Sequence, residues 1–268
     1  MKKSPLLLPL LLLALSPLLA AQPAWLSEIN LKKPGANLKL RPIQLTYDLS
    51  WNGSVVAGQT TFRFGFPDKR YPRNFIAQSY GSTTGLARNL FPFDFNFTSF
   101  LRTSDYRPQV FVAEETQKDQ HKYTKTEFTK KGVSSTRKKT KLPSKEVSHS
   151  TSTFDAPFAI DAQSAVLWVR SLDLKKGEEA VFVVMPFKTP YLCRVTHLGN
   201  EVRSARRTVK YDLKLQKIDK ETLELKTYDK LKSFVIWVSD DAERIPLEFR
   251  SKVFVGDVRA VLTSKSYL

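Results

Sequence analysis

Few residues in this chain of 268 residues have the types and spacing that chemistry requires. Asp240 and Asp241 form the clearest carboxylate pair, and such a pair can serve as general acid and base in a hydrolase. Neighbouring residues at a strand end point in different directions, however, and an aspartate at a turn commonly bonds its own backbone. Arg244 can pair with either carboxylate. The pattern therefore favours a structural turn over a catalytic or metal-binding site.

Histidine and cysteine add no catalytic or metal motif. His121, His149 and His197 do not show the His-x-x-x-His spacing of a metal site, and no cysteine cluster accompanies them. Gly-x-Ser-x-Gly elbows and glycine-rich phosphate loops are also missing from the sequence. Cys193, the single cysteine, lies in an alternating apolar segment, which predicts a buried and unreactive thiol. We expect no metal ion, no cofactor and no enzymatic activity.

Aromatic residues point to a ligand of another kind. Two segments place a phenylalanine at every second position, which is the spacing of one face of a β-strand. A helix expected near residues 161–170 adds a tryptophan to these apolar positions. The residues of this predicted apolar face are Phe62, Phe64, Phe66, Phe93, Phe95, Phe97 and Trp168. They either form part of the core or line a cavity for a lipid or another amphiphile, as inward residues do in larger barrels.

Basic residues form the second candidate surface. The formal net charge of +17 favours anionic partners. Residues at about 130–150 lack apolar periodicity, which predicts a basic loop, either mobile or the tip of a long hairpin. Aromatic residues are sparse there, so we do not expect nucleic acid as a partner. The loop is either solvated without a partner or contacts an anionic polymer or membrane surface through Lys130, Lys131, Arg137, Lys138, Lys139 and Lys141.

The first residues have the pattern of an export signal. Lys2 and Lys3 precede an apolar run over residues 6–19, and small residues follow up to Ala21. This arrangement predicts a secretory signal peptide over residues 1–21 and an exported protein of the periplasm or cell envelope. The run falls short of the ~20 residues that a membrane span needs, and two prolines interrupt it.

The remaining chain reads as an irregular lead-in over residues 22–42 and a single β-rich domain over 43–264. Asn52-Gly53 predicts a hairpin, and Gly58 inside the return strand predicts a bulge or bend. Asp161 can cap the one clear helix. With about a dozen strands and no strand-helix alternation, the fold class is mainly β, a curved antiparallel meander sheet with one helix packed on it.

The segment that ends the domain resembles a known pattern. Trp237, Ser239, Asp241, Arg244 and Pro246 are similar to the Trp-x-Ser-x-Asp-x-x-Arg-x-Pro pattern of an exported bacterial family catalogued as domain of unknown function 3108. Further similar pieces are the hairpin at 45–58, the crossing at 84–87, Asp161 with Ser164 and Arg170, and the hairpin at 255–262.

This resemblance would cover residues 43–264, although the basic segment looks longer than the pattern requires. It implies a periplasmic β protein with an open, curved sheet, similar to lipoprotein-carrier half-barrels, and it implies no activity.

Four functions are carried forward. The leading hypothesis is a non-enzymatic envelope protein that binds a lipid or another amphiphile on an apolar sheet face. The alternative is an adaptor for an anionic envelope polymer or membrane surface, through the basic loop. An envelope hydrolase and an outer-membrane barrel are weaker hypotheses. Residues 181–184 and 234–238 are apolar on both faces, whereas strands of such a barrel alternate between lipid and a polar lumen.

Overall fold

The structure is a computed structural model that describes residues 22–268 apart from 37–39, 69–70, 204, 230 and 254–255. The signal peptide predicted for residues 1–21 lies outside the described residues. In the described part of the chain, three short helices accompany the sheet: α1 (Trp25–Glu28), α2 (Gly85–Leu90) and α3 (Ala162–Arg170).

Strands make up most of the fold, in two halves. The N-terminal half contains β1 (Ile43–Trp51), β2 (Val55–Asp68), β3 (Tyr71–Thr83), β4 (Phe93–Arg102), β5 (Pro108–Gln117), β6 (Gln120–Thr129), β7 (Gly132–Lys141) and β8 (Val147–Phe154). The C-terminal half contains β9 (Glu179–Val184), β10 (Tyr191–Arg203), β11 (Arg206–Ile218), β12 (Leu225–Thr227), β13 (Leu231–Ser239), β14 (Pro246–Val253) and β15 (Gly256–Tyr267).

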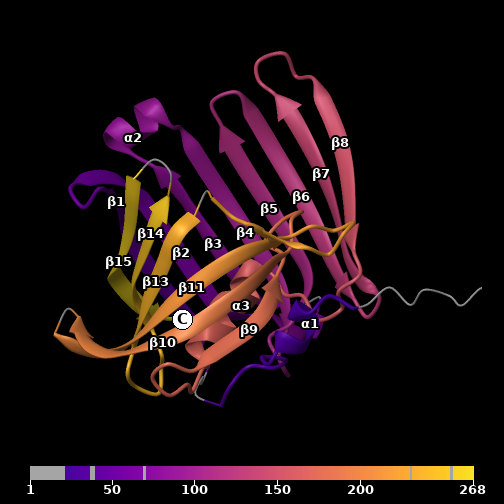
Figure 1. The fold of residues 1–268 in the computed structure, drawn as a ribbon. Coiled ribbons are helices and arrows are strands. Elements are labelled where there is room, and N and C mark those ends of the chain that lie inside the picture. Colours follow the sequence, from indigo (N-terminus) through magenta and orange to yellow (C-terminus); the bar gives the residue numbers. More distant parts are fainter. Residues whose placement is uncertain (1–21, 37–39, 69–70, 204, 230, 254–255) are drawn as a thin grey trace, which may run out of the picture.

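All described strands belong to one antiparallel sheet. Its order is β8-β7-β6-β5-β4-β3-β2-β1-β15-β14-β13-β11-β10-β9, with β12 paired to β11. Pairing of β1 with β15 joins the two halves, which face each other across α3 (Figure 1). The described strands leave β8 and β9 as the two edges, so the sheet is open. The predicted fold class, a curved antiparallel sheet or open half-barrel with a helix packed on it, is confirmed.

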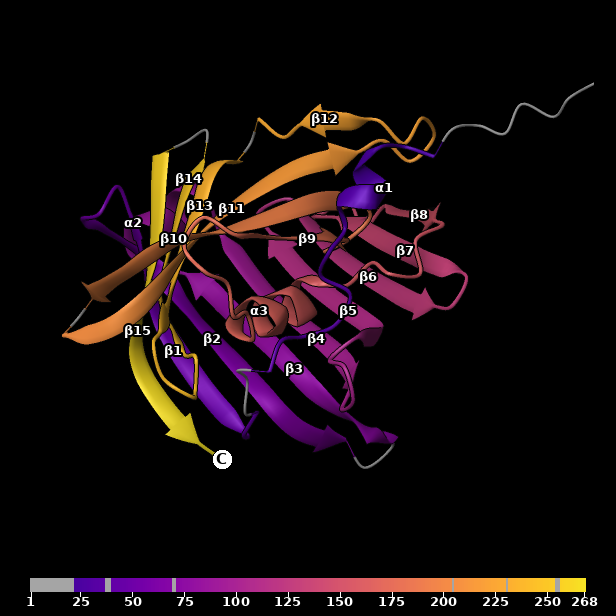
Figure 2. The same ribbon diagram turned by 60° about the horizontal axis from the view of Figure 1, so that its bottom comes forward.

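Two phenylalanines measure how strongly the sheet curves. Phe62 of β2 and Phe249 of β14 have ring centroids 6.2 Å apart, although β1 and β15 lie between their strands. In a flat sheet with strands about 4.8 Å apart, these strands would be separated by roughly 14 Å. The sheet therefore bends sharply around β1 and β15, and its concave face wraps α3 (Figure 2).

The free edge of β9 is covered by segments from elsewhere in the chain. The backbone N–H groups of Asn30 and Leu31 donate to the Val181 carbonyl at 3.2 and 3.1 Å. Farther along the strand, the Ile160 N–H donates to the Val183 carbonyl at 3.0 Å. Covering an edge in this way prevents pairing with another chain. The lead-in, predicted as irregular, therefore contributes to the sheet edge.

The gap between the edge strands β8 and β9, which we call the seam, is filled by the lead-in. Trp25 of α1 is 5% exposed, and its Nε1 donates to the Leu223 carbonyl at 2.7 Å. It belongs to a core cluster that draws residues from both edges, including Val133, Phe154, Val181 and Val183. The two halves of the sheet are thus held together at the seam by side-chain packing.

The prediction of a basic loop at residues 130–150 is wrong, because this segment forms strands. Those residues include all of β7 and the first half of β8, and β7 pairs with β6 along its whole length. The concave face of these strands buries hydroxyl groups in place of apolar side chains: Thr124, Thr126 and Ser135 are all 0% exposed. The Thr126 and Ser135 hydroxyls bond each other at 2.9 Å. Strands that bury Ser and Thr show no apolar periodicity, so their sequence resembles that of a loop.

Candidate functional site

Helix α3 lies at the centre of the concave face. Asp161 caps it, because its side chain accepts a hydrogen bond from the Ser164 N–H at 2.7 Å. The helical period then divides the side chains into two groups. The closed face consists of Gln163, Ser164, Leu167 and Arg170. The pocket face consists of Ala162, Ala165, Val166 and Val169.

The closed face is packed and hydrogen-bonded. Leu167 is 0% exposed and lies in a cluster with residues of β1 to β4 and β14. The Gln163 side-chain amide donates to the Ser79 hydroxyl of β3 at 2.6 Å. The Arg170 guanidinium donates to the carbonyls of Glu243 and Arg244, both at 3.0 Å. These contacts fix the position of the helix against the sheet.

The pocket face borders a cavity of about 420 Å³ between α3 and the concave face of the C-terminal half. Aromatic and aliphatic side chains dominate its far wall: Phe182, Leu213, Leu215, Phe234, Ile236 and Phe249. Among the described lining residues, none carries a charge, and only Tyr228 and Ser251 carry a hydroxyl. Several of these side chains, including Phe234 and Phe249, are only half-buried. The cavity is therefore apolar and open to solvent.

Cys193 lies in the wall of this pocket. Its side chain is 2% exposed, and burial raises the pKa of the thiol to about 12. A thiol with so high a pKa is neutral at physiological pH and is a poor nucleophile. The pocket thus offers apolar surface and no reactive group.

The phenylalanines of β4 lie beside the pocket. Phe93, Phe95 and Phe97 form a half-buried ladder with successive centroid distances of 5.7 and 4.8 Å. Phe97 also contacts the ring of Phe187 at 5.4 Å. Phe187 follows Pro186, which lines the pocket. None of the three rings lines the pocket, and Phe97 alone connects the ladder to it, through Phe187.

The prediction that Phe62, Phe64 and Phe66 share one face of the strand is wrong. Gly65 adopts φ +85°, and the β2–β3 register shifts between Phe64 and Phe66. Such a bulge reverses the side-chain alternation. Phe66 consequently lies on the opposite face, with the Arg63 guanidinium 4.3 Å from its ring centroid.

Two other predicted ligand contacts belong to the core. Phe64 and Trp168 are both 0% exposed and do not line the pocket. The Trp168 indole donates to the Asp105 carbonyl at 3.1 Å. Phe62 does not line the pocket, but its ring contacts Phe249, which does. Phe62 therefore supports the pocket wall.

The residues of the actual far wall were missed. Their alternation was visible in the sequence, for example where Leu213 and Leu215 alternate with Asp212 and Lys214 on β11. Alternation identifies an inward face, but it does not distinguish an inward side chain that packs from one that borders a cavity. That distinction depends on how far α3 lies from the C-terminal half.

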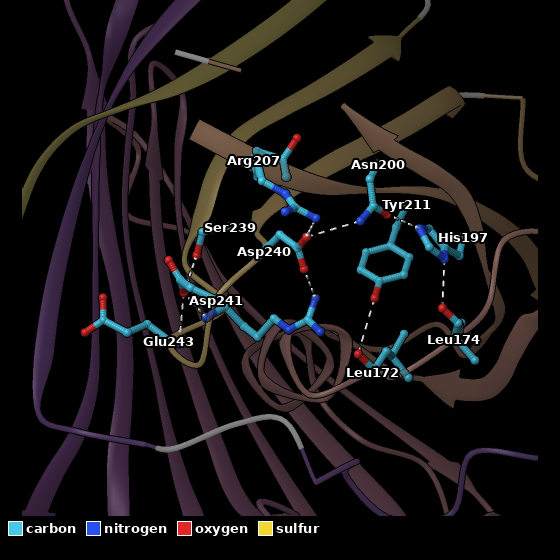
Figure 3. A network of polar contacts seen from close by, with 12 residues as sticks. Leu172, Leu174, His197, Asn200, Arg207, Tyr211, Ser239, Asp240, Asp241 and Glu243 are labelled. Atoms are coloured by element: carbon cyan, nitrogen blue, oxygen red, sulfur yellow. Dashed lines mark hydrogen bonds and ion pairs between the residues drawn. The ribbon is translucent and has the colours of Figure 1, made fainter. Parts of the chain in front are cut away.

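The two aspartates of the β13–β14 turn have different partners (Figure 3). Asp241 Oδ1 accepts hydrogen bonds from the Ser239 hydroxyl at 2.8 Å and from the N–H groups of Glu243 and Arg244 at 2.9 and 3.1 Å. Arg244 itself adopts φ +49°, a left-handed conformation that these bonds support. Asp241 therefore shapes the turn.

Asp240 joins this turn to its neighbours. Its Oδ2 accepts hydrogen bonds from Arg207 at 3.3 Å and Asn200 at 3.2 Å, and Arg244 lies 3.9 Å from its Oδ1. Asn200 also bonds His197, whose other ring nitrogen bonds the Leu174 carbonyl at 2.8 Å (Figure 3). This network braces the strand ends.

The described residues contain no group of three or more His, Cys, Asp or Glu side chains that could hold a metal ion. None of the helices in the described ranges is both long and apolar enough to span a membrane.

The six basic residues predicted to contact an anionic surface are not gathered on one surface. Lys130 and Lys131 lie at the turn before β7, at the opposite end of the strand from Lys141. Alternation along β7 sends Lys138 to the convex face and Arg137 and Lys139 to the concave face. Lys141 pairs with Glu146 at 2.7 Å.

Sequence comparison identifies the family. Residues 46–263 match the family model described as Protein of unknown function (DUF3108). The chain belongs to the DUF3108 family. The match includes the turn of Asp240 and Asp241, and it confirms the resemblance drawn from the sequence. No curated protein matches the chain.

Comparison with solved structures finds two matches to this DUF3108 protein, both at low sequence identity. The first is a β-barrel-like protein of domain of unknown function DUF1849 from Brucella abortus, with a TM-score of 0.52 and 8% identity over 86% of this chain and 99% of that chain. It shows a shared fold. The second is lipoprotein LppX from Mycobacterium tuberculosis, with 9% identity over 83% of this chain and 85% of that chain. Its TM-score of 0.23 is too low to indicate a shared fold.

Proposed function

We propose that this protein is a non-enzymatic binding protein of the periplasm or cell envelope that holds a lipid or another amphiphile between α3 and the C-terminal half of the sheet. One observation carries the proposal: the cavity of about 420 Å³ has an apolar lining without charged groups. Ligand pockets typically enclose about 300–1,000 Å³ and are mostly apolar. The predicted signal peptide supports the compartment.

The half-buried rings of the pocket supply the driving force. Phe234 and Phe249 expose apolar surface to the cavity. Removing such surface from water contributes roughly 25 cal/mol per Å². An acyl chain would cover these rings and lose its own contact with water at the same time. A polar small molecule would gain little, because the lining offers few hydrogen-bonding groups.

The absence of an activity is supported by the same geometry. The carboxylates of Asp240 and Asp241 are bonded to the turn and its neighbours. The pocket thiol of Cys193 is kept neutral by burial. The Ser239 hydroxyl, which donates to Asp241, is only 1% exposed and also accepts a hydrogen bond from the Ile245 N–H at 2.8 Å, so it serves the turn and is not presented to a substrate.

A substitution that fills the pocket tests the proposal. Ala165 lies half-buried on the pocket face, so Ala165→Phe places a ring in the cavity. Binding of a fluorescent long-chain fatty acid, titrated with the mature protein, should weaken about tenfold or more. The midpoint of thermal unfolding should change little, because the ring enters existing space.

The matched control is Ala24→Phe, at an exposed position before α1. It adds the same ring outside the pocket and should leave fatty-acid binding unchanged. Failure of the wild-type protein to bind the fatty acid, or equal weakening in both variants, would refute the proposal.

A further inference from the structure

Three cations meet beside the pocket, at the seam. Arg137 lies on the concave face of β7, Lys188 lies in the turn between β9 and β10, and Lys220 follows β11. They come from both halves of the sheet, and we call them the seam cations.

Hydroxyl groups are the partners of the seam cations. Lys188 Nζ donates to the Ser150 hydroxyl at 2.8 Å, and Lys220 Nζ donates to the Ser152 hydroxyl. Arg137 Nε donates to the Thr124 hydroxyl at 2.9 Å.

In the described part of the chain, the seam cations are not neutralised by carboxylates. Asp219, the neighbour of Lys220, is bonded to Lys226 at 2.6 Å. Within the described ranges, no carboxylate forms an ion pair with a seam cation. The cluster therefore carries net positive charge at the seam.

The seam cations influence one another. Burial lowers the pKa of Lys188, and the charges of Arg137 and Lys220 lower it further. Like charges that converge in this way repel, and an anion placed between them would relieve the repulsion. The Ser150 hydroxyl beside them could donate a hydrogen bond to the same anion, whereas the Ser152 hydroxyl donates to the Lys188 carbonyl at 3.3 Å.

The cluster adjoins the pocket through Phe187. Pro186 lines the pocket, and the ring of Phe187 lies 5.9 Å from the Arg137 guanidinium carbon. On the sheet side, the pocket includes Leu215 of β11, and Lys220 follows the end of that strand. An apolar tail in the pocket would therefore place its other end toward the seam cations.

We propose that the ligand is an anionic amphiphile, with its negative headgroup bound by Arg137, Lys188 and Lys220 and its tail in the pocket. The inference rests on the proposed function and adds the charge of the ligand to it. The basis of the proposal is that a cluster of cations borders an uncharged pocket. The pocket suits the apolar tail of such a molecule, and the cations suit its anionic headgroup.

Two lysolipids with the same tail test the headgroup. Palmitoyl-lysophosphatidylglycerol is anionic and palmitoyl-lysophosphatidylcholine is zwitterionic, and each can be titrated by displacement of the bound fluorescent fatty acid. The wild-type protein should bind the anionic lysolipid about tenfold more tightly. The triple variant Arg137→Gln, Lys188→Gln, Lys220→Gln should lose this preference and keep its affinity for the zwitterionic lysolipid.

The control variant removes three charges at exposed positions that do not belong to the seam cations: Lys130→Gln, Lys131→Gln, Lys138→Gln. This control variant should still prefer the anionic lysolipid as the wild-type protein does, because the preference depends on the seam cations and not on the net charge of the protein. Raising the salt concentration should reduce the preference of the wild-type protein and of the control.

Four results would overturn the inference. Equal binding of both lysolipids by the wild-type protein, or a preference that survives in the seam variant, refutes the headgroup site and leaves the proposed function intact. Equally tight binding of glycerol phosphate, which has no tail, would make the seam a site for free phosphate instead. Binding of neither lysolipid would refute the proposed function and the headgroup site with it.

Discussion

The two faces of α3 meet the sheet in different ways. On the closed face, Leu167 is fully buried and Arg170 donates to two backbone carbonyls. On the pocket face, Ala165 and Val166 are half-buried and border a cavity of about 420 Å³. One short helix therefore has one side that is packed and hydrogen-bonded and another that leaves apolar space.

This difference separates stability from binding within a single helix. Contacts of the closed face hold α3 in place, and Val169 adds packing against the C-terminal half, where it is 2% exposed, while Ala165 and Val166 stay open to the cavity. A cavity between packed elements normally costs stability. Here the closed face offsets that cost, and the space stays available for a ligand.

The largest effect is expected from Arg170→Ala. Its guanidinium is 2% exposed, and burial lowers the pKa of Arg170 to about 10, so the group is still charged at neutral pH. Its removal leaves the carbonyls of Glu243 and Arg244 without their donor. We expect a loss of about 4 kcal/mol in the free energy of unfolding, measured by urea denaturation.

Arg207→Ala is the matched control for this experiment. The Arg207 side chain is 80% exposed and pairs with Asp240 at 3.3 Å. Its removal should cost less than about 1 kcal/mol, as for other surface ion pairs. Similar losses in the two variants would show that the closed face is not the side that fixes α3.

The next effect compares adjacent residues on the two faces. Leu167→Ala removes a side chain that is 0% exposed and should lower the free energy of unfolding by about 3 kcal/mol. Val166→Ala removes methyl groups that already border the cavity and should cost about 1 kcal/mol or less. Both are measured by urea denaturation of the ligand-free protein. Equal costs would indicate that the pocket face is as tightly packed as the closed face.

The smallest effect is expected from the pH dependence at Asp161, the N-cap of α3. Its carboxyl is 0% exposed, and burial raises its pKa above the usual value. The folded state therefore holds the proton more tightly than the unfolded state. The resulting stabilisation is complete below the ordinary pKa of an aspartate and is lost as the pH rises through the raised pKa.

Asp161→Asn should remove this dependence and keep an acceptor for the Ser164 N–H. In urea denaturation at a series of pH values, the variant should gain stability relative to the wild-type protein as the pH rises from 4 to 7. A relative stability that falls over this range would contradict the sign of the shift.

Comparison of two glycines of β2 shows how far the sequence could predict the fold. Gly58 lies in an alternating segment and predicted a bulge, and the β1–β2 register does shift at Gly58. Gly65 gave no such signal, because the phenylalanines around it continue the alternation. Its register shift nevertheless turns Phe66 to the opposite face. The difference arises because a bulge depends on how the partner strand pairs, and local sequence does not specify that pairing.

The sequence predicted the apolar character of the candidate site but not its position in the fold. The aromatic alternation of β2 and β4 directed attention to the N-terminal half, whereas the pocket lies against Phe182, Phe234 and Phe249 of the C-terminal half. The basic segment was expected to act as a single loop. As a strand pair, it distributes its cations over two faces, and of the six predicted basic residues only Arg137 belongs to the seam cations.

The sequence by itself determined the local features of this protein. Two-residue periodicity marks the strands, Asp161 starts α3, and Ser239 to Arg244 carry the groups that close the β13–β14 turn. Each of these follows from interactions between residues close together in the chain.

Only the tertiary structure decided where the pocket and the seam cations lie. The curvature of the sheet brings Phe62 to Phe249, and the approach of β8 to the turn after β9 brings Arg137 to Lys188. Both juxtapositions join residues that are far apart in the sequence. They depend on long-range strand pairing and on the distance at which the closed face of α3 holds the helix.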